Sequence, residues 1–520
     1  MMNYYIGLDF GTTNSIISYF ENNEVYTYKY GFPGSQEEYI PSFIAYEENS
    51  PEIGSSARAT ATNNPNVESY GNFKMQLPTE SEIDHNGNSH HVFEVTTDYL
   101  RQLLFSEDNS FSFARQKGEI EGLVVSVPEI WQRDIRNIGR ERLKKIIEEK
   151  LELPLIQLVS EPVAAASYYA WKAQGDQEKL LLVCDVGGGT FDVSICRIDG
   201  NNNIEVLYFD GEGYQGLETA GVAFDSRCVE TAYKKGKKEN EPEIKKGDAR
   251  FSRLLKDFEQ AKLYFHDKAT NRIKNYLRDQ ESYAARDVYY FSDYSINCQE
   301  VVEAFAPIKA RIQDVITRVN QWLEKTHYNF DQVFMVGGFS QFFLVQKAIS
   351  EALGIEDNDQ RIDRSANLET SAYAISYGAC LIANGEVDPI EKYEHTLGFV
   401  AHRSEDYQEE KVTLIEGKTV ALDNLTEPYF SDRLVTAIQN KIYIKLWVDP
   451  QSRGCRHQET INEPISLPNF SSKAVYKVGM RVDRSQICYL VIQEQDSKAT
   501  IEHELGDIIK KMFPAGLFIA

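Results

Sequence analysis

The sequence predicts a two-lobed α/β protein followed by an antiparallel β domain. Three observations support this prediction. Segments 4–20 and 180–198 repeat one strand–turn–strand pattern, strands alternate with helices as far as residue 384, and short stretches beyond residue 395 alternate apolar and polar side chains. A chain of 520 residues is also too long for one hydrophobic core, so more than one domain is expected.

The repeated segments read YYIGLDFGTTNSIISYF and LLLVCDVGGGTFDVSICRI. Each places an apolar strand, an aspartate (Asp9 or Asp185), a glycine-containing turn with threonine and a second apolar strand in the same order. The duplication predicts two similar lobes, each with one β-hairpin tip. Two such tips could face one ligand.

The segments between and after these hairpins alternate between strand and helix. We expect strands at 122–128 and 155–159, separated by a charged helix at 131–150. Ser160 is the expected N-cap of the next helix, with Glu161 and Pro162 in its first turn. In the second lobe we expect strands at 204–209 and 331–336, helices at 224–235, 249–265, 340–353 and 369–384, and a solvated charged loop at 234–248.

The composition changes after residue 384, where the helical period fades. Stretches such as NKIYIKLWVD and QICYLVIQEQ alternate as half-buried strands do. We therefore divide the chain into an α/β domain at 1–384, a linker at 385–394, a β domain at 395–507 and a short tail at 508–520.

Charge and composition exclude some classes of function. The formal net charge of -24 argues against a sequence-independent binder of nucleic acid or anionic membranes, because phosphate binding needs clustered Lys and Arg. The seven cysteines form no CxxC pair and the nine histidines are dispersed. With no signal peptide and no apolar run of membrane-spanning length, we expect a cytoplasmic protein.

The glycine triplet at 187–189 needs an explanation, since glycine weakens a strand. Consecutive glycines can aim several backbone N–H groups at one anion, and phosphate is the obvious one. The glycines join two strands, whereas a Walker loop runs from a strand into a helix. An aspartate at each strand end fits hydrated Mg²⁺ beside nucleotide phosphates. The alternative, that both acids merely cap turns, is weaker for two matched hairpins than for one.

These residues resemble the nucleotide-binding domain of the seventy-kilodalton heat-shock chaperone family, within the actin-like ATPase superfamily. Five motifs follow the family's order over nearly four hundred residues: LDFGTTNS, SEPVAAA, CDVGGGTFDVSI, MVGGFSQ and AYAISYGA. The resemblance implies a two-lobed actin-like ATPase domain, with a duplicated ribonuclease-H-like core and helical insertions, followed by a β-sandwich-like substrate-binding domain.

The resemblance also implies roles for individual residues, with ATP or ADP and Mg²⁺ as cofactors. Asp9 and Asp185 would hold Mg²⁺ through water, Glu161 and Asp192 would lie near the metal and the attacking water, and Lys74 would be the catalytic lysine. The phosphates would be contacted by Gly11, Thr12, Thr13, Asn14, Gly187, Gly188, Gly189 and Thr190.

The adenosine side departs from the family's pattern. Its matching positions are Glu259, Lys262, Leu263, Gly337, Gly338, Phe339 and Gln341. In the family two arginines sandwich the adenine; here Leu263 and Gln341 stand in their places. Loss of cation–π stacking worth roughly 0.5 to 2 kcal/mol per arginine predicts weaker nucleotide binding with relaxed base selectivity.

The leading functional prediction is an ATP-hydrolysing, chaperone-like protein that binds extended polypeptide on its β domain. Its expected partners are unfolded polypeptide and a co-chaperone or exchange factor, without nucleic acid or membrane, and we expect a monomer. We expect the chain to lack the family's helical lid, and VDPIEKYE stands where the family has an acidic, leucine-rich linker. We therefore expect coupling between ATP and substrate to differ from that of the family. One alternative is a nucleotide-gated switch with little turnover; another, a sugar kinase, is disfavoured by SEPVAAA and the β domain.

Overall fold

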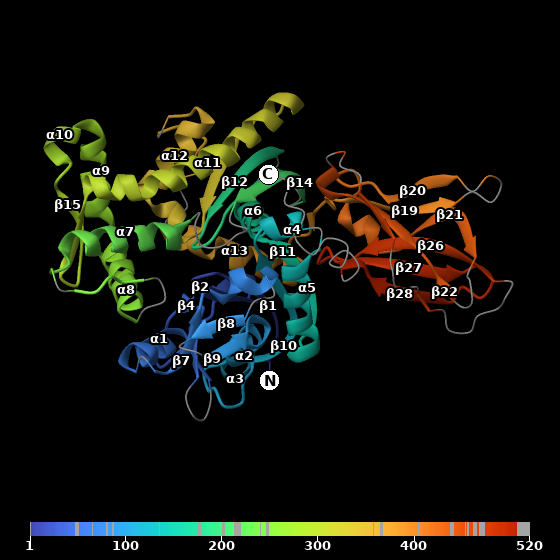
Figure 1. The fold of residues 1–520 in the computed structure, drawn as a ribbon, viewed down its shortest axis with the longest axis horizontal. Coiled ribbons are helices and arrows are strands. Elements are labelled where there is room, and N and C mark those ends of the chain that lie inside the picture. Colours follow the sequence, from blue (N-terminus) through green and yellow to red (C-terminus); the bar gives the residue numbers. More distant parts are fainter. Residues whose placement is uncertain are drawn as a thin grey trace.

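In a computed structural model, the chain folds into two α/β lobes and a β domain (Figure 1). The structure describes residues 2–506 except 47–50, 65, 80–81, 86–87, 135, 174–177, 200–202, 213–219, 240, 246–248, 357, 364–367, 403–405, 407, 437–440, 453, 455–456, 461–464 and 467–473. The predicted tail at 508–520 lies outside the described residues. Within them, no helix is long and apolar enough to cross a membrane.

Lobe I is built on a sheet with the strand order β11-β10-β1-β2-β3, and β4 also pairs with β2. β1 runs antiparallel to β2 and parallel to β10, which is parallel to β11. The strands are β1 (Met2–Phe10), β2 (Asn14–Glu21), β3 (Glu24–Thr27), β4 (Ile40–Pro41), β10 (Gly118–Val127) and β11 (Leu155–Ser160).

Smaller elements surround this sheet. They are β5 (Phe43–Tyr46), β6 (Pro51–Ile53), β7 (Glu68–Gly71), β8 (Glu82–His85), β9 (Asn88–His91), α1 (Gly54–Asn63), η1 (Phe73–Thr79), α2 (Val92–Leu104), α3 (Phe113–Gln116), α4 (Ile130–Arg133), α5 (Ile138–Lys145) and a π-helical turn η2 (Ile146–Lys150). The expected single helix at 131–150 is therefore wrong. Asn137 is left-handed (φ 53°), and Arg136 turns back to bind the Asp134 carboxylate, which separates α4 from α5.

Lobe II repeats the pairing of lobe I. β12 runs antiparallel to β13 and parallel to β17, and the sheet order is β17-β12-β13-β14-β18. The elements are β12 (Lys179–Val186), β13 (Phe191–Ile198), β14 (Ile204–Glu212), β15 (Asp287–Phe291), β16 (Tyr294–Asn297), β17 (Gln332–Val336), β18 (Pro389–Ile390), α7 (Gly221–Gly236), α8 (Ala249–Tyr264), α9 (His266–Arg278), α10 (Gln280–Tyr283), α11 (Cys298–Thr326), η3 (Gly338–Gln341) and α12 (Phe343–Leu353). The helix expected from 340 begins at 343, because Phe342 has an extended backbone.

Two helices, α6 (Glu161–Ala173) and α13 (Leu368–Ala383), join the lobes and share one apolar core with strands of both sheets. They pack very closely: a Cβ on Gly378 would lie 1.6 Å from the Ala164 carbonyl oxygen, so only glycine fits there. α6 begins at Glu161 as predicted, but the expected Ser160 cap is wrong. Among the described residues its hydroxyl makes no capping hydrogen bond, since it faces Glu129 instead.

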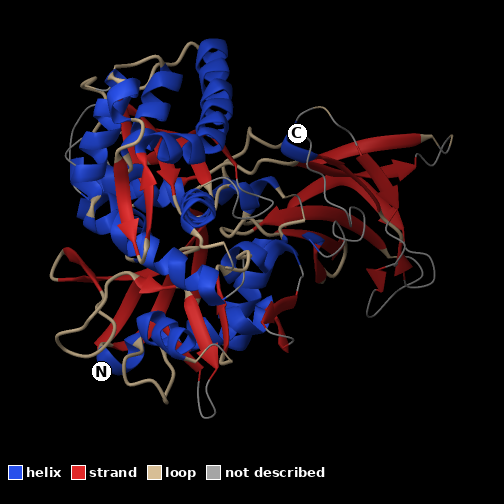
Figure 2. Cartoon of the chain, turned by 60° about the vertical axis from the view of Figure 1, so that its left-hand side comes forward, coloured by secondary structure: helices blue, strands red, loops and turns tan. Residues whose placement is uncertain are grey.

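The β domain is strand-rich and extends from the two helix-covered lobes (Figure 2). Two four-stranded sheets, β20-β19-β23-β24 and β21-β26-β27-β28, share one apolar core. The elements are β19 (Thr396–His402), β20 (Glu409–Ile415), η4 (Leu422–Leu425), β21 (Tyr429–Thr436), β22 (Lys441–Ile442), β23 (Lys445–Asp449), η5 (Pro450–Ser452), β24 (His457–Thr460), β25 (Ile465–Ser466), β26 (Val475–Val482), β27 (Cys488–Glu494) and β28 (Thr500–Glu504). The predicted fold class is confirmed.

The polar linker at 385–394 contains a strand, which the sequence did not predict. Its β18 runs parallel to β14 at the edge of the lobe II sheet, and Lys392 binds Glu205 of β14 at 3.0 Å. The β domain also contacts lobe I: the Ser485 hydroxyl accepts from the Leu158 N–H at 3.1 Å, and Lys144 pairs with Asp483. The linker is thus docked on the lobes.

Candidate active site

The two predicted hairpin tips face each other across the lobes. A Cβ on Gly188 would lie 2.3 Å from the Thr13 hydroxyl, and one on Gly189 would lie 3.0 Å from the Thr12 hydroxyl. The first turn of α7 is attached to the tip of lobe II, because the Val222 N–H donates a hydrogen bond to the Gly188 carbonyl at 2.9 Å. Glycine is required at 188 because a side chain would push the tips apart.

The predicted acids lie at the strand ends beside these tips. Asp9 is the last residue but one of β1 and accepts a hydrogen bond from Ser126 at 3.0 Å. Asp185 near the end of β12 pairs across the sheet with Asp192 of β13, whereas the residue opposite Asp9 in β2 is Ile16. The two hairpins therefore differ at this position: the lobe II hairpin carries two acids opposite each other, and the lobe I hairpin carries one.

Lys74 and Glu161 complete the group. The Lys74 ammonium in η1 donates to Glu161 at 2.5 Å, and both side chains are almost fully buried. η1 lies between β7 and β8 of lobe I, whereas Glu161 is the first residue of α6. The five predicted catalytic residues are thus brought together from five different elements.

Negative charge exceeds positive charge in this buried group. Burial, then the Glu161 charge, raises the pKa of Asp9 to about 7 and that of Asp192 to about 8. Burial, reinforced by Glu161 and the other two aspartates, also raises the pKa of Asp185 well above its usual range. Lys74 opposes these shifts only in part, because one ammonium faces four carboxylates.

These residues fit hydrated Mg²⁺ and phosphate. Among the described residues, no group of three or more His, Cys, Asp or Glu side chains is arranged to hold a metal ion. Buried oxygens of Asp185, Asp192 and Thr13 have no hydrogen-bond partner of ordinary geometry within the described chain, and Gly187 borders open space. Oxygen ligands and unpaired negative charge are what Mg²⁺ requires.

Some of the predicted adenosine residues come together at η3. The Gly337 backbone is left-handed (φ 83°), and a Cβ there would lie 2.2 Å from the Asp185 carboxylate, which ties this turn to the phosphate side. Lys262 holds Asp225 of α7 at 2.7 Å and lies over the buried Phe339 ring at 5.5 Å. Burial, only partly opposed by Lys262, raises the pKa of Asp225 to about 6.

The remaining adenosine positions are more open. Glu259 forms an ion pair with Arg58 of α1 at 3.5 Å, which links the lobes, while Leu263 is 77% exposed at the end of α8. Gly338 has no neighbour that a Cβ would meet, and Gln341 is half-buried beside Ser340. Roles of all these residues in nucleotide binding stay predictions.

Three residues near the site were missed from the sequence. Ser126 is opposite Asp9 because β1 pairs in register with β10. Asp225 pairs with Lys262, and Gly211 of β14 lies opposite Asp192, where a Cβ would come within 2.5 Å of its carboxylate. Strand register and helix packing place these three residues beside the site. Only for Ser126 does the sequence hold a signal, because it lies in a strand expected between the two hairpin motifs.

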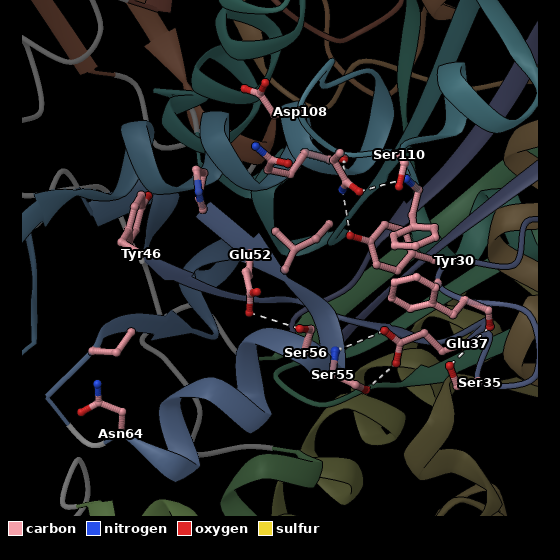
Figure 3. A pocket seen from close by; sticks show the side chains of 18 of the residues that line it. Tyr30, Ser35, Glu37, Tyr46, Glu52, Ser55, Ser56, Asn64, Asp108 and Ser110 are labelled. Atoms are coloured by element: carbon pink, nitrogen blue, oxygen red, sulfur yellow. Dashed lines mark hydrogen bonds between the residues drawn. The ribbon is translucent and has the colours of Figure 1, made fainter. Parts of the chain in front are cut away.

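Lobe I also holds a cavity of about 1260 Å³ between β6, the start of α1 and the segment near Asn109 (Figure 3). Its described lining includes Glu37, Glu52, Glu68 and Asp108 but no Lys or Arg. Glu37 accepts from the Ser55 N–H at 3.1 Å. The cavity shares no residue with the predicted nucleotide contacts, so it is separate from the candidate active site.

Two matched lobes, facing glycine hairpins and buried acids between them define a nucleotide-binding protein of the actin-like ATPase class. The family model described as "Hsp70 protein" matches residues 5–98 and 82–386, which is more than half of the chain. The chain therefore belongs to the Hsp70 family. It accordingly has a nucleotide-binding function of the chaperone type, as the resemblance predicted.

Proposed function

We propose that this protein hydrolyses ATP slowly between its lobes and binds extended polypeptide on its β domain, in the cytoplasm. The single observation that carries the proposal is the meeting of two hairpin tips beside four buried carboxylates and Lys74. A site of this shape and charge suits a magnesium nucleotide, and it is hard to explain as structural support, since unpaired buried carboxylates are costly.

Each residue has a distinct task in this proposal. Asp9 and Asp185 would hold hydrated Mg²⁺, and that ion would supply positive charge beside the phosphates. The backbone N–H groups of both tips orient the phosphate chain. Lys74 stabilises negative charge on the transferred group, while Glu161 and Asp192 position the attacking water. Catalysis then consists of orientation and charge neutralisation, with no covalent step on the protein.

The β domain offers an edge for a strand-like partner. β21 lies at the end of its sheet, and Tyr429 and Leu434 on that strand are 47% and 48% exposed. An edge strand presents free backbone groups, and its apolar side chains add contacts with alternate residues of an extended peptide.

Single-turnover hydrolysis of ATP, with and without an unfolded polypeptide, tests the proposal. We expect measurable hydrolysis that the polypeptide stimulates, and a loss of roughly 100-fold in Asp185→Asn, because a misplaced metal and phosphate lose their alignment. Asp199→Asn, beyond β13, is the matched control and should leave the rate unchanged. An unaltered rate in Asp185→Asn would exclude the proposed role of this site.

A nucleotide-gated switch with little turnover is the second candidate. Two features favour the switch. The exposed Leu263 would weaken adenine contacts, and the docked β18 connects the nucleotide domain to the β domain. ATP binding that changes protection of the linker without single-turnover hydrolysis would select the switch over the chaperone ATPase.

A further inference from the structure

Glu129 is a buried acid that the proposed chemistry does not use. It directly precedes α4, and its side chain is completely buried. Neither carboxylate oxygen has a hydrogen-bond partner of ordinary geometry among the described residues. Because a buried ionised carboxylate without partners is very unfavourable, this position calls for a neutral carboxyl or a specific charged partner.

The groups whose charge or polarity acts on Glu129 come from four elements or segments. They are Ser160 of β11, Arg140 of α5, Asp192 and Cys196 of β13, and Glu391, which follows β18 in the linker. Of these, Arg140 is the cation, and it too is completely buried. Its Nη1 donates to the carbonyls of Leu158 at 3.2 Å and Ser485 at 3.0 Å, while its Nε and Nη2 have no partner of ordinary geometry in the described chain.

The positive charge of Arg140 acts on three acids where the linker docks: Glu391, Glu129 and Asp483. Glu391 is held there by Gln486 of the β domain, whose Nε2 donates to it at 2.7 Å. Asp483 is paired with Lys144, so Glu129, Glu391 and Arg140 leave one excess negative charge where water is excluded. A single bound proton removes that charge. Burial, and then the nearby Glu391 charge, raises the pKa of Glu129 well above its ordinary value.

Glu129 also lies next to the candidate active site. The backbone N–H of Ile130, the following residue, faces the Asp192 carboxylate. A movement of Glu129 therefore also moves a backbone N–H that faces Asp192. The groups Asp192, Ile130, Glu129, Arg140 and Glu391 form a series from the nucleotide site to the linker, in which each acts electrostatically on the next.

We propose that Glu129 is a positioning residue that shares Arg140 with Glu391 and carries one proton while the linker is docked. When the linker leaves, Glu391 leaves with it and Glu129 ionises against Arg140. Docking then takes up a proton, so the docked state weakens as pH rises, by up to about tenfold per pH unit. This inference rests on the proposed function, because it names a regulator of the same ATP site.

Hydrogen exchange of the Leu158 amide in the full chain tests this inference. That N–H is covered by the Ser485 hydroxyl only while the β domain is docked. Protection would be measured from pH 5.5 to 8.5 and corrected for the intrinsic pH dependence of exchange. We expect docking to weaken with pH in the natural protein and to become independent of pH in Glu129→Gln, which keeps the shape but cannot ionise.

Glu149→Gln is the matched control. Glu149 is an exposed acid of η2, the turn that follows α5, and it does not act on Arg140. This variant should keep the slope. If Gln at 129 weakens docking at every pH, loss of the slope still supports the inference. A retained slope in Glu129→Gln, or no slope in the natural protein, overturns it.

A separate measurement distinguishes this inference from the proposed function. ATP binding by calorimetry and single-turnover hydrolysis report on the nucleotide site itself. Absence of both would refute the proposed function while the exchange slope still decides the role of Glu129. Normal hydrolysis with a flat slope in the natural protein would refute the inference about Glu129 alone.

Discussion

Lys74 and Glu161 form an ion pair from which water is almost excluded. Removing one partner of such a pair leaves an uncompensated charge, which typically costs about 3–5 kcal/mol. We expect Lys74→Met to lower the free energy of unfolding by an amount of that order and to abolish hydrolysis.

The double variant Lys74→Met with Glu161→Gln separates the two effects. It removes the stranded charge, so urea unfolding should recover most of the lost stability while hydrolysis stays absent. Recovery of hydrolysis in the double variant would show that Lys74 serves the fold and not the chemistry.

Leu263 is the residue predicted to replace an arginine beside the adenine, and its side chain is largely exposed. We expect Leu263→Arg to tighten ATP binding by about 2- to 30-fold, since a restored cation–π contact is worth roughly 0.5 to 2 kcal/mol. Calorimetry with ATP and GTP would measure both affinity and base selectivity.

Tyr264→Arg is the control, because it adds the same charge one position further along the same exposed helix end. Equal gains in both variants would indicate a general effect of charge and would remove the specific role predicted for position 263.

At the scale of elements, the facing hairpins depend on two glycines with different surroundings. A Cβ at 188 would overlap the Thr13 hydroxyl, whereas one at 187 would meet no atom within 4 Å. We expect Gly188→Ala to destabilise the nucleotide-free protein by about 1–3 kcal/mol through overpacking, and Gly187→Ala to leave its stability nearly unchanged. Urea unfolding of the two variants would test this, and equal losses would contradict the arrangement of the tips.

Element boundaries show where sequence reasoning was sufficient. The strands around Asp9 and Asp185 follow from apolar runs and glycine turns, which are local signals. The break between α4 and α5 depends on the left-handed backbone of Asn137 and on the bond from Arg136 to Asp134. The charged helical pattern of this segment does not predict it. That break matters, because α5 then presents Arg140 to the β domain.

At the scale of the whole molecule, the buried acids make stability depend on pH. Asp192 has a pKa of about 8 when folded, against about 4 when unfolded. Between these values the folded state keeps a proton that the unfolded state has lost, so stability should fall as pH rises from 5 to 8.

Unfolding in urea without Mg²⁺ across this pH range would measure the effect. Asp192→Asn has no proton to lose and should give a shallower decline, and added Mg²⁺ with ATP should oppose the decline by favouring the ionised acids. A slope that is the same in the natural protein and Asp192→Asn would contradict the assigned pKa shift.

The sequence by itself determined the two lobes, the hairpins, the acids at the strand ends and the family, because each is written in short motifs with fixed order. Only the tertiary structure decided which groups meet. Lys74 reaches Glu161 from another element, Ser126 reaches Asp9 through strand register, and β18 joins the lobe II sheet despite a polar sequence. Such contacts depend on packing between segments far apart in the sequence, so local sequence patterns do not predict which buried charged groups lie next to each other.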